Sequence, residues 1–197
     1  MQLHLPVDLQ RSLTLVKNKN MKEITLQDFA KSIRDVPNFP KPGILFKDIT
    51  TALKDADVLR FIVDKLYEQY KGKGITKVVG IESRGFIIGS ILAYKLGAGF
   101  VLMRKPGKLP ADAYQEEYAL EYGTDTLEIH KDALSAKDVV LLHDDLLATG
   151  GSANAALNLI QKTGAEDILV DFLIELKFLN GRKKLKAKEI FSLVSFD

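Results

Sequence analysis

The 197-residue sequence has no cysteine and no tryptophan, and it has only three histidines. The lack of cysteine excludes a disulfide framework and a zinc site with cysteine ligands, and it is compatible with a cytoplasmic protein. We also find no serine–histidine arrangement of the kind that nucleophilic catalysis uses. The chemistry of this chain must therefore depend on other side chains.

Long apolar runs and a large net charge are missing as well. No stretch of about 20 apolar residues occurs, so the sequence predicts no membrane span. A net charge of +2 gives no argument for a nucleic-acid or membrane partner. With 46% hydrophobic and 27% charged residues, the composition is ordinary for a globular protein.

The first twenty residues differ from the rest of the chain. Pro6, Asp8 and Arg11 interrupt the scattered leucines, so this segment is a poor signal peptide. Beyond Met21, Thr25 and Asp28 form a capping pattern that precedes an amphipathic helix. We expect either that residues 1–20 are a loosely ordered extension or that Met21 is the natural start, with residues 21–197 forming a single domain.

The most informative segment is VVLLHDDLLATGGSANA, residues 139–155. Val139–Leu142 predicts a buried strand, and the apolar spacing after Ser152 predicts a helix with Ser152 as its N-cap and Gly164 just past its end. The loop between them, Ala148–Ser152, therefore offers backbone N–H groups at a helix start, where they bind phosphate.

Two carboxylates, Asp144 and Asp145, precede this loop. Carboxylates accept hydrogen bonds from vicinal hydroxyls and repel phosphate, so they suit a ribose. The segment has neither Gly-Lys-Ser/Thr nor G-x-G-x-x-G, which excludes a Walker loop and a dinucleotide fingerprint. The pattern predicts a ribose 5-phosphate site, the alternative being an ordinary strand–turn–helix with a solvated acid pair.

Strands and helices alternate along the chain. Strands are predicted at 78–81, 100–103 and 168–174, and helices at 55–70 and 86–96. This order predicts an α/β fold with a mostly parallel twisted sheet and helices on both faces. Ligands of such sheets lie beyond the carboxyl ends of the strands, where ESRG (82–85) and RKPGKLP (104–110) also fall. Two basic loops beside the acid pair suit a sugar with phosphates at two ends, although RKPGK alone could be a solvated loop.

Six segments together resemble the adenine branch of the type I phosphoribosyltransferase family: VPNFPKPGILFKDIT, VVGIESRGFIIG, VLMRKPGKLP, YALEYGTDTLEIHKDAL, VVLLHDDLLATGG and FLIELKFLNGRKKL. The resemblance runs from about Ile24 to Phe196. It implies the type I phosphoribosyltransferase fold with a small N-terminal base-binding hood, about residues 21–50. It also implies transfer of the 5-phosphoribosyl group from 5-phosphoribosyl 1-diphosphate to adenine, giving AMP and pyrophosphate in purine salvage.

The resemblance implies a role for each matching residue. Asp144 and Asp145 hold the ribose and steady its cationic ring, while the loop residues hold the 5-phosphate: Ala148, Thr149, Gly150, Gly151 and Ser152. Arg84, Arg104, Lys105 and Lys108 reach the diphosphate, the last three from a mobile loop, roughly Arg104–Glu121, that closes as a lid.

Base recognition follows from the same resemblance. Phe46 stacks on adenine, the backbone of Leu45 and Lys47 pairs with its polar edge, Glu121 lies near N7 as the catalytic acid, and Tyr122 packs over the site. Mg²⁺ accompanies the diphosphate, with no certain protein ligand, and the family is usually a homodimer. We expect a cytoplasmic enzyme without nucleic-acid or membrane partners.

Two positions depart from the family pattern. His143 stands where an aliphatic residue is usual, and it is either a hydrogen-bonded neighbour of the sheet rim or a group that tunes Asp144. Ser152 replaces the usual threonine and keeps its hydroxyl. Two other functions stay open: a phosphoribosyltransferase for another purine base, and a non-catalytic regulator that senses the diphosphate sugar. The second is disfavoured because the N-terminal segment is too short for a DNA-binding domain.

Overall fold

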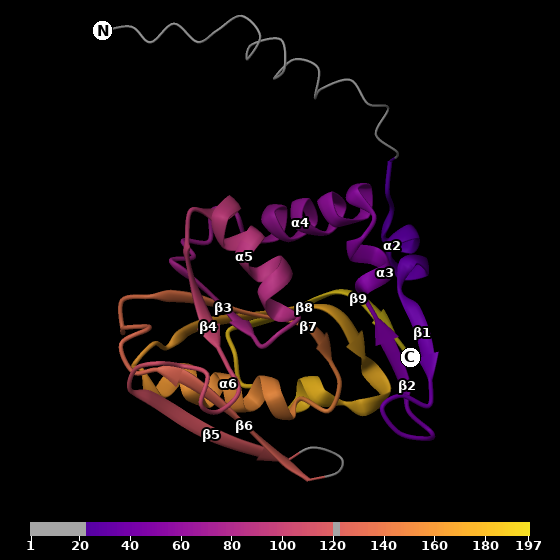
Figure 1. The fold of residues 1–197 in the computed structure, drawn as a ribbon. Helices are drawn as coiled ribbons and strands as arrows, with labels where there is room; N and C mark the ends of the chain where they lie inside the picture. The colour runs from indigo at the N-terminus through magenta and orange to yellow at the C-terminus, as the bar shows by residue number, and fades with distance from the viewer. Residues whose placement is uncertain (1–22, 120–122) are drawn as a thin grey trace, which may run out of the picture.

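A computed structural model describes residues 23–119 and 123–197 of the chain. The expectations for residues 1–20, Met21, Glu121 and Tyr122 lie outside these described residues. Within them, no helix is long and apolar enough to cross a membrane. The centre of the molecule is a five-stranded sheet of order β4-β3-β7-β8-β9 in which every neighbouring pair is parallel (Figure 1).

The sheet strands are rich in Val, Ile and Leu because helices and a hairpin cover the sheet. Their bounds are β3 Lys77–Ile81, β4 Gly99–Met103, β7 Val139–Leu147, β8 Asp167–Leu176 and β9 Glu189–Phe196. β7 is longer than predicted, so Asp144 and Asp145 lie inside the strand rather than after it. Because side chains alternate along a strand, the two carboxylates point to opposite sides of the sheet rim.

Helices cover both faces of the sheet, as predicted. α4 (Ala56–Tyr70) and α5 (Gly85–Leu96) lie on one face, and α6 (Gly151–Lys162) lies on the other (Figure 1). Each face has its own apolar core: the first includes Ile62, Leu66 and Leu141, and the second includes Leu142, Ala156 and Ile160. Sequence periodicity therefore predicted this three-layer arrangement.

The N-terminal part of the described chain forms a separate small unit beside the sheet. It consists of α2 (Leu26–Ser32), the antiparallel hairpin of β1 (Arg34–Pro37) and β2 (Leu45–Asp48), and the short helix α3 (Thr50–Leu53). The predicted capping box is confirmed, because Thr25 and Asp28 exchange hydrogen bonds at the start of α2. Figure 1 shows that β1 and β2 lie near the C-terminus of the chain.

The expectation that Arg104–Glu121 is one long loop is wrong for its second half. Ala113–Ala119 forms strand β5, which pairs antiparallel with β6 (Thr124–His130) over α6. β5 carries three consecutive polar residues, so its sequence reads as a loop, but α6 holds it: Asn158 and Lys162 both donate to Glu116, at 2.9 and 2.5 Å. Only residues 105–112 remain as a loop between Arg104 and β5.

Candidate functional site

Three chemically rich loops meet at the carboxyl edge of the sheet because their strands are neighbours. β3 lies between β4 and β7, so three segments share one rim: ESRG after β3, RKPGK after β4, and Ala148–Ser152, here called the phosphate loop, after β7. A cavity of about 200 Å³ opens there, lined by Arg84 and by residues 144–153. The structure thus brings the predicted sugar and phosphate residues together.

The phosphate loop leads directly into α6. Gly150 has φ +80° and is the N-cap, so the helix begins at Gly151 and the prediction of Ser152 as N-cap is wrong. The reason is that the left-handed conformation of Gly150 turns the chain into the helix two residues earlier than a cap at Ser152 would. The ladder of α6 opens with the Asn154 amide donating to the Gly150 carbonyl at 3.0 Å. The amides of Gly151, Ser152 and Ala153 come before this first helical hydrogen bond. They have no acceptor within the helix and therefore suit a phosphate.

A glycine that the sequence analysis did not single out supports this loop. Gly181 packs so closely that a Cβ on it would lie 2.2 Å from the Ala148 carbonyl oxygen, and a Cβ on Gly150 would lie 2.6 Å from the Gly181 carbonyl oxygen. The Asn180-Gly181 pair signals a turn in the sequence, but nothing local reveals the contact with a loop so distant in the chain. Gly181 belongs to the short helix η2 (Gly181–Lys184), where Arg182 pairs with the buried Glu175.

The acid pair is held in an asymmetric environment. Asp145 is buried and accepts a hydrogen bond from Arg84 Nε at 2.5 Å. Burial raises the pKa of Asp144 well above its usual range, and the neighbouring charge of Asp145 adds to this effect. Gly85 allows the start of α5 to approach β7 closely, since a Cβ on Gly85 would lie 2.7 Å from the His143 carbonyl oxygen.

The three cations of the RKPGK loop contact carboxylates of neighbouring elements. Arg104 Nε lies 3.3 Å from Glu82 Oε2, and Lys108 also donates to Glu82. Lys105 donates to Asp125 and, at 3.0 Å, to the Tyr118 hydroxyl. Although burial alone would raise it, hydrogen bonds from Lys108, the Lys105 amide and Arg104 lower the pKa of Glu82 to about 2. The loop is therefore held by charge pairs with Glu82, which follows β3, and with Asp125 on β6.

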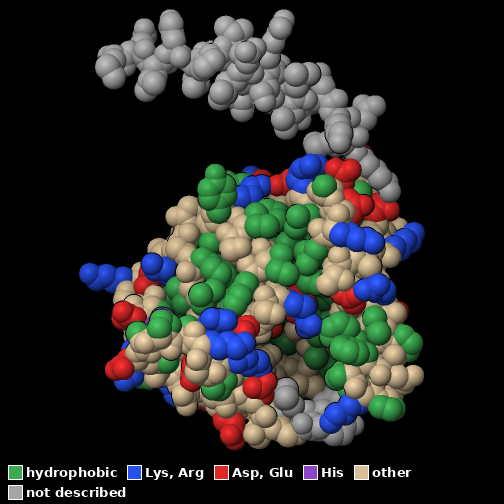
Figure 2. Space-filling model, in the orientation of Figure 1, with side chains coloured by type: hydrophobic (Ala, Val, Ile, Leu, Met, Phe, Trp, Pro, Cys, Tyr) green, Lys and Arg blue, Asp and Glu red, His purple; other side chains and the backbone are tan. Residues whose placement is uncertain are grey.

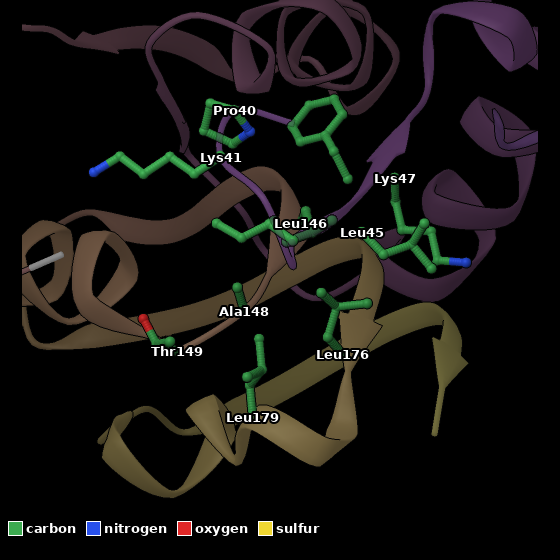
Figure 3. A pocket seen from close by; sticks show the side chains of 11 residues that line it. Pro40, Lys41, Leu45, Lys47, Leu146, Ala148, Thr149, Leu176 and Leu179 are labelled. Carbon is green, nitrogen blue, oxygen red and sulfur yellow. The ribbon is translucent and has the colours of Figure 1, made fainter. Parts of the chain in front are cut away.

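A second cavity, of about 430 Å³, lies beside the first. Its walls are mostly apolar and come from the hairpin on one side and the sheet on the other: Pro40, Lys41, Ile44, Leu45, Phe46 and Lys47 face Leu146, Ala148, Thr149, Leu176 and Leu179 (Figure 3). Leu146, Ala148 and Thr149 line both cavities. The apolar cavity therefore adjoins the cavity of the acid pair and the phosphate loop. Figure 2 shows a hollow beside Lys and Arg side chains on this face of the molecule.

Phe46 lines the apolar cavity and contacts Arg84, which lines the other one. Phe39 packs edge-on against its ring with centroids 5.2 Å apart, and the Arg84 guanidinium lies 5.0 Å from its centroid. Leu45 and Lys47 flank Phe46 on the four-residue strand β2. The structure therefore places all three predicted base-site residues on one strand and in one wall.

His143 is fully buried behind the acid pair. Its Nδ1 lies 3.0 Å from Oδ1 of Asp171, which is its register partner on β8 and is also fully buried. The interpretation of His143 as a hydrogen-bonded neighbour of the sheet rim is confirmed. Asp171, inside the strand predicted at 168–174, was not singled out, because a lone carboxylate in an apolar run gives no sign of its partner.

Comparisons with known proteins can now be set beside this geometry. A sequence profile of the phosphoribosyl transferase domain matches residues 47–195. The adenine phosphoribosyltransferase of Phocaeicola vulgatus is 63% identical over 152 residues, which cover 77% of this chain and 87% of that protein. The chain belongs to the adenine phosphoribosyltransferase family.

Other members of the adenine phosphoribosyltransferase family agree over a longer stretch. The enzyme of Geotalea uraniireducens is 56% identical over 171 residues, covering 87% of this chain and 100% of that one. A solved structure from Giardia lamblia, complexed with 9-deazaadenine, has a TM-score of 0.86 at 42% identity and covers 89% of this chain and 99% of that chain. The type I phosphoribosyltransferase fold is thereby confirmed.

Proposed function

We propose that this chain transfers the 5-phosphoribosyl group from 5-phosphoribosyl 1-diphosphate to adenine, giving AMP and pyrophosphate in purine salvage. The observation that carries the proposal is the pair of adjoining cavities: one polar and lined by the acid pair and phosphate loop, the other apolar and lined by Phe46. Their shared wall brings a base in the second cavity next to a ribose in the first.

On the sugar side, the amides and hydroxyls of Ala148–Ser152 hold the 5-phosphate at the start of α6. Asp144 and Asp145 hold the ribose hydroxyls. As the bond from C1 to the diphosphate lengthens, positive charge develops on the ring, and the two carboxylates stabilise it. Asp144 must be ionised for this role. Because its pKa is raised, the fraction of Asp144 that is ionised depends on the charges of its neighbours.

The cations act on the leaving group. Arg84 matches the diphosphate oxygens with its planar fork, while Arg104, Lys105 and Lys108 reach them from the loop. In the structure these groups contact Asp145, Glu82 and Asp125, and we propose that the diphosphate takes over part of these contacts. Closure of the remaining loop, residues 105–112, then excludes water that would hydrolyse the activated sugar.

On the base side, adenine stacks on Phe46 while the backbone of Leu45 and Lys47 pairs with its amine edge. A 6-oxo purine would put donor against donor or acceptor against acceptor there, which disfavours it. Glu121 shares a proton with adenine N7 as N9 attacks C1, and Tyr122 packs over the site. For Glu121 and Tyr122 the support is the family resemblance.

The donor chemistry of the sugar cavity fits Mg²⁺, because Asp144 and Asp145 offer the oxygen ligands that this ion prefers. No group of three acidic or histidine side chains within residues 23–119 and 123–197 could form a protein cage for it. We therefore propose that the ion enters with the diphosphate. When bound, it neutralises charge on the leaving group.

A homodimer is proposed from the exposed apolar side chains along α5 and the edge strand β4. Ile87 and Leu102 are exposed there, and Tyr94 is 86% exposed. Figure 2 shows hydrophobic side chains gathered on the face that carries α5. Contiguous apolar surface of this kind marks protein interfaces. Light scattering of the wild type and of Ile87→Glu tests the dimer. We further propose a cytoplasmic enzyme with one domain over residues 21–197, in which residues 21–50 form the hood.

The deciding experiment is incubation with 5-phosphoribosyl 1-diphosphate, Mg²⁺ and a panel of adenine, hypoxanthine, guanine and xanthine, with detection of nucleotide. We expect AMP to form with a kcat/KM at least about a hundredfold above that for hypoxanthine. A preference for another base would reassign the specificity. Binding of the sugar without any turnover would instead favour a regulator.

A further inference from the structure

The base site has two walls that belong to different sheets. The β1–β2 hairpin carries Phe46 and is a two-stranded sheet of its own, while Leu146 and Leu176 belong to the five-stranded sheet. An isolated two-stranded hairpin is only marginally stable in water. Contacts outside its own hydrogen bonds must therefore set the distance between the two walls.

The side chain of Lys47 makes one such contact. Its ammonium points away from the other labelled side chains of the pocket (Figure 3). Nζ donates to Oδ1 of Asp35, the register partner of Lys47 on β1, at 2.6 Å. Nζ also lies 4.1 Å from the centroid of the Phe196 ring, and the lysine side chain is only 11% exposed.

Phe196 completes the link to the other wall. It is the last residue of β9, and it is in register with Leu176 of β8, which lines the base cavity. Its ring packs against the apolar core on the α4 and α5 side of the sheet. A cation held over an aromatic face is attracted by the ring quadrupole, and more strongly where water is excluded.

We infer that Lys47 and Phe196 form an anchor that positions strand β2, and with it the stacking ring and the base-pairing backbone, against the central sheet. The penultimate residue of the chain is then a positioning residue for adenine, although it lies outside the cavity. This inference rests on the proposed function, because it assumes that β2 binds the base. In this proposal the side chain of Lys47 holds β2 in place, and the backbone of Lys47 pairs with the base.

The test is steady-state kinetics on Phe196→Leu, which keeps apolar packing but removes the ring, and on Lys47→Met, which keeps the stem but removes the charge. Each variant should raise the KM for adenine about threefold to tenfold, with the KM for 5-phosphoribosyl 1-diphosphate changed less than twofold. The double variant should cost no more than the worse single one, because both remove the same contact. Phe196→Tyr and Lys47→Arg should restore the wild-type KM.

Lys95 provides a matched control, since it too pairs with a carboxylate, Asp64, and lies 5.0 Å from an aromatic ring, that of Tyr67. That contact joins α4 to α5, away from the base cavity. Lys95→Met should leave the KM for adenine unchanged. If Phe196→Leu raises both KM values equally, or lowers only the melting temperature, the anchor is wrong. If the wild type makes no AMP, the proposed function fails, which is a separate outcome.

Discussion

The acid pair and the phosphate loop lie on the central sheet, whereas Phe46 and Lys47 lie on a four-residue strand outside it. Asp145 and the flanking strand are buried, and the loop is fixed by backbone contacts too close for a Cβ. β2 is half exposed and is held by side-chain contacts at its edges. The sugar side of the site is thus held by buried groups and backbone contacts, and the base side by side-chain contacts.

This difference matches the demands of the proposed reaction. Charge develops at the ribose, and stabilising it requires groups that are already in place when the reaction starts. The base needs stacking and hydrogen bonds, which act mainly on how tightly it binds. Substitutions on the sugar side should therefore lower kcat, and those on the base side should mainly raise KM. The predictions below test this contrast, from the largest effect to the smallest.

The largest effect is expected from Asp145→Asn and Asp144→Asn. Removing one electrostatic partner of a developing charge typically costs about 2.7–4 kcal/mol, which is about a hundredfold to a thousandfold in kcat. Circular dichroism should show that both variants fold, because asparagine keeps the size of the side chain. Single-turnover kinetics would measure the loss, and near-normal turnover in both variants would contradict the ribose assignment.

The next effect is expected from Gly181→Ala. Its Cβ would lie 2.2 Å from the Ala148 carbonyl oxygen, so the phosphate loop must move, and kcat/KM for the diphosphate sugar should fall about tenfold to a hundredfold. Gly72→Ala is the control, because a Cβ on Gly72 would have no atom within 4 Å, although its φ of +80° adds a backbone strain that Gly181 does not share. Equal effects of the two substitutions on kcat/KM would show that the contact does not position the loop.

The same contrast explains what the sequence could predict. The sugar side was predictable because Asp144 to Ser152 are contiguous, and a strand, a turn and a helix start follow from local pattern. The residues that contact this segment and the RKPGK loop from elsewhere in the chain were not predictable. Gly181 meets the phosphate loop and Asp125 pairs with Lys105 only because the fold brings them together. Strand β5 was not predicted, because two successive glutamates, Glu116 and Glu117, are typical of a loop. In the structure, Lys162 and Asn158 of α6 compensate the charge of Glu116. On the base side, Phe46 was found by resemblance, but the contact of Lys47 with Phe196 depends on how two sheets meet.

Phe46→Ala should have a smaller effect and a different kinetic signature. It removes the stacking ring but no hydrogen bond, so the KM should rise about tenfold for every base while kcat changes little. The preference for adenine over hypoxanthine should persist, because the backbone of Leu45 and Lys47 would still pair with the amine edge. Lys47→Ala should likewise keep that preference. A switch to hypoxanthine in Lys47→Ala would show that the side chain contacts the base.

The smallest effect concerns the acid stability of the hairpin. A hydrogen bond from the Thr50 amide, and then the paired Arg34, lower the pKa of Asp48 to about 2. Because the folded-state pKa lies below the unfolded value of about 3.9, Asp48 stabilises the fold above pH 4, and this contribution disappears as the pH falls from about 4 to about 2.

Since the Arg34 side chain is largely exposed, we expect a contribution of only about 1 kcal/mol to the free energy of unfolding. Urea titrations of wild type and Asp48→Asn should differ by that amount at pH 7, and the difference should shrink steadily towards pH 3. Asp57→Asn, which breaks the exposed pair with Arg60 on α4, is the control and should change little at any pH. A difference between wild type and Asp48→Asn that is constant with pH would mean that asparagine disturbs packing, and that the charge of Asp48 does not stabilise the hairpin.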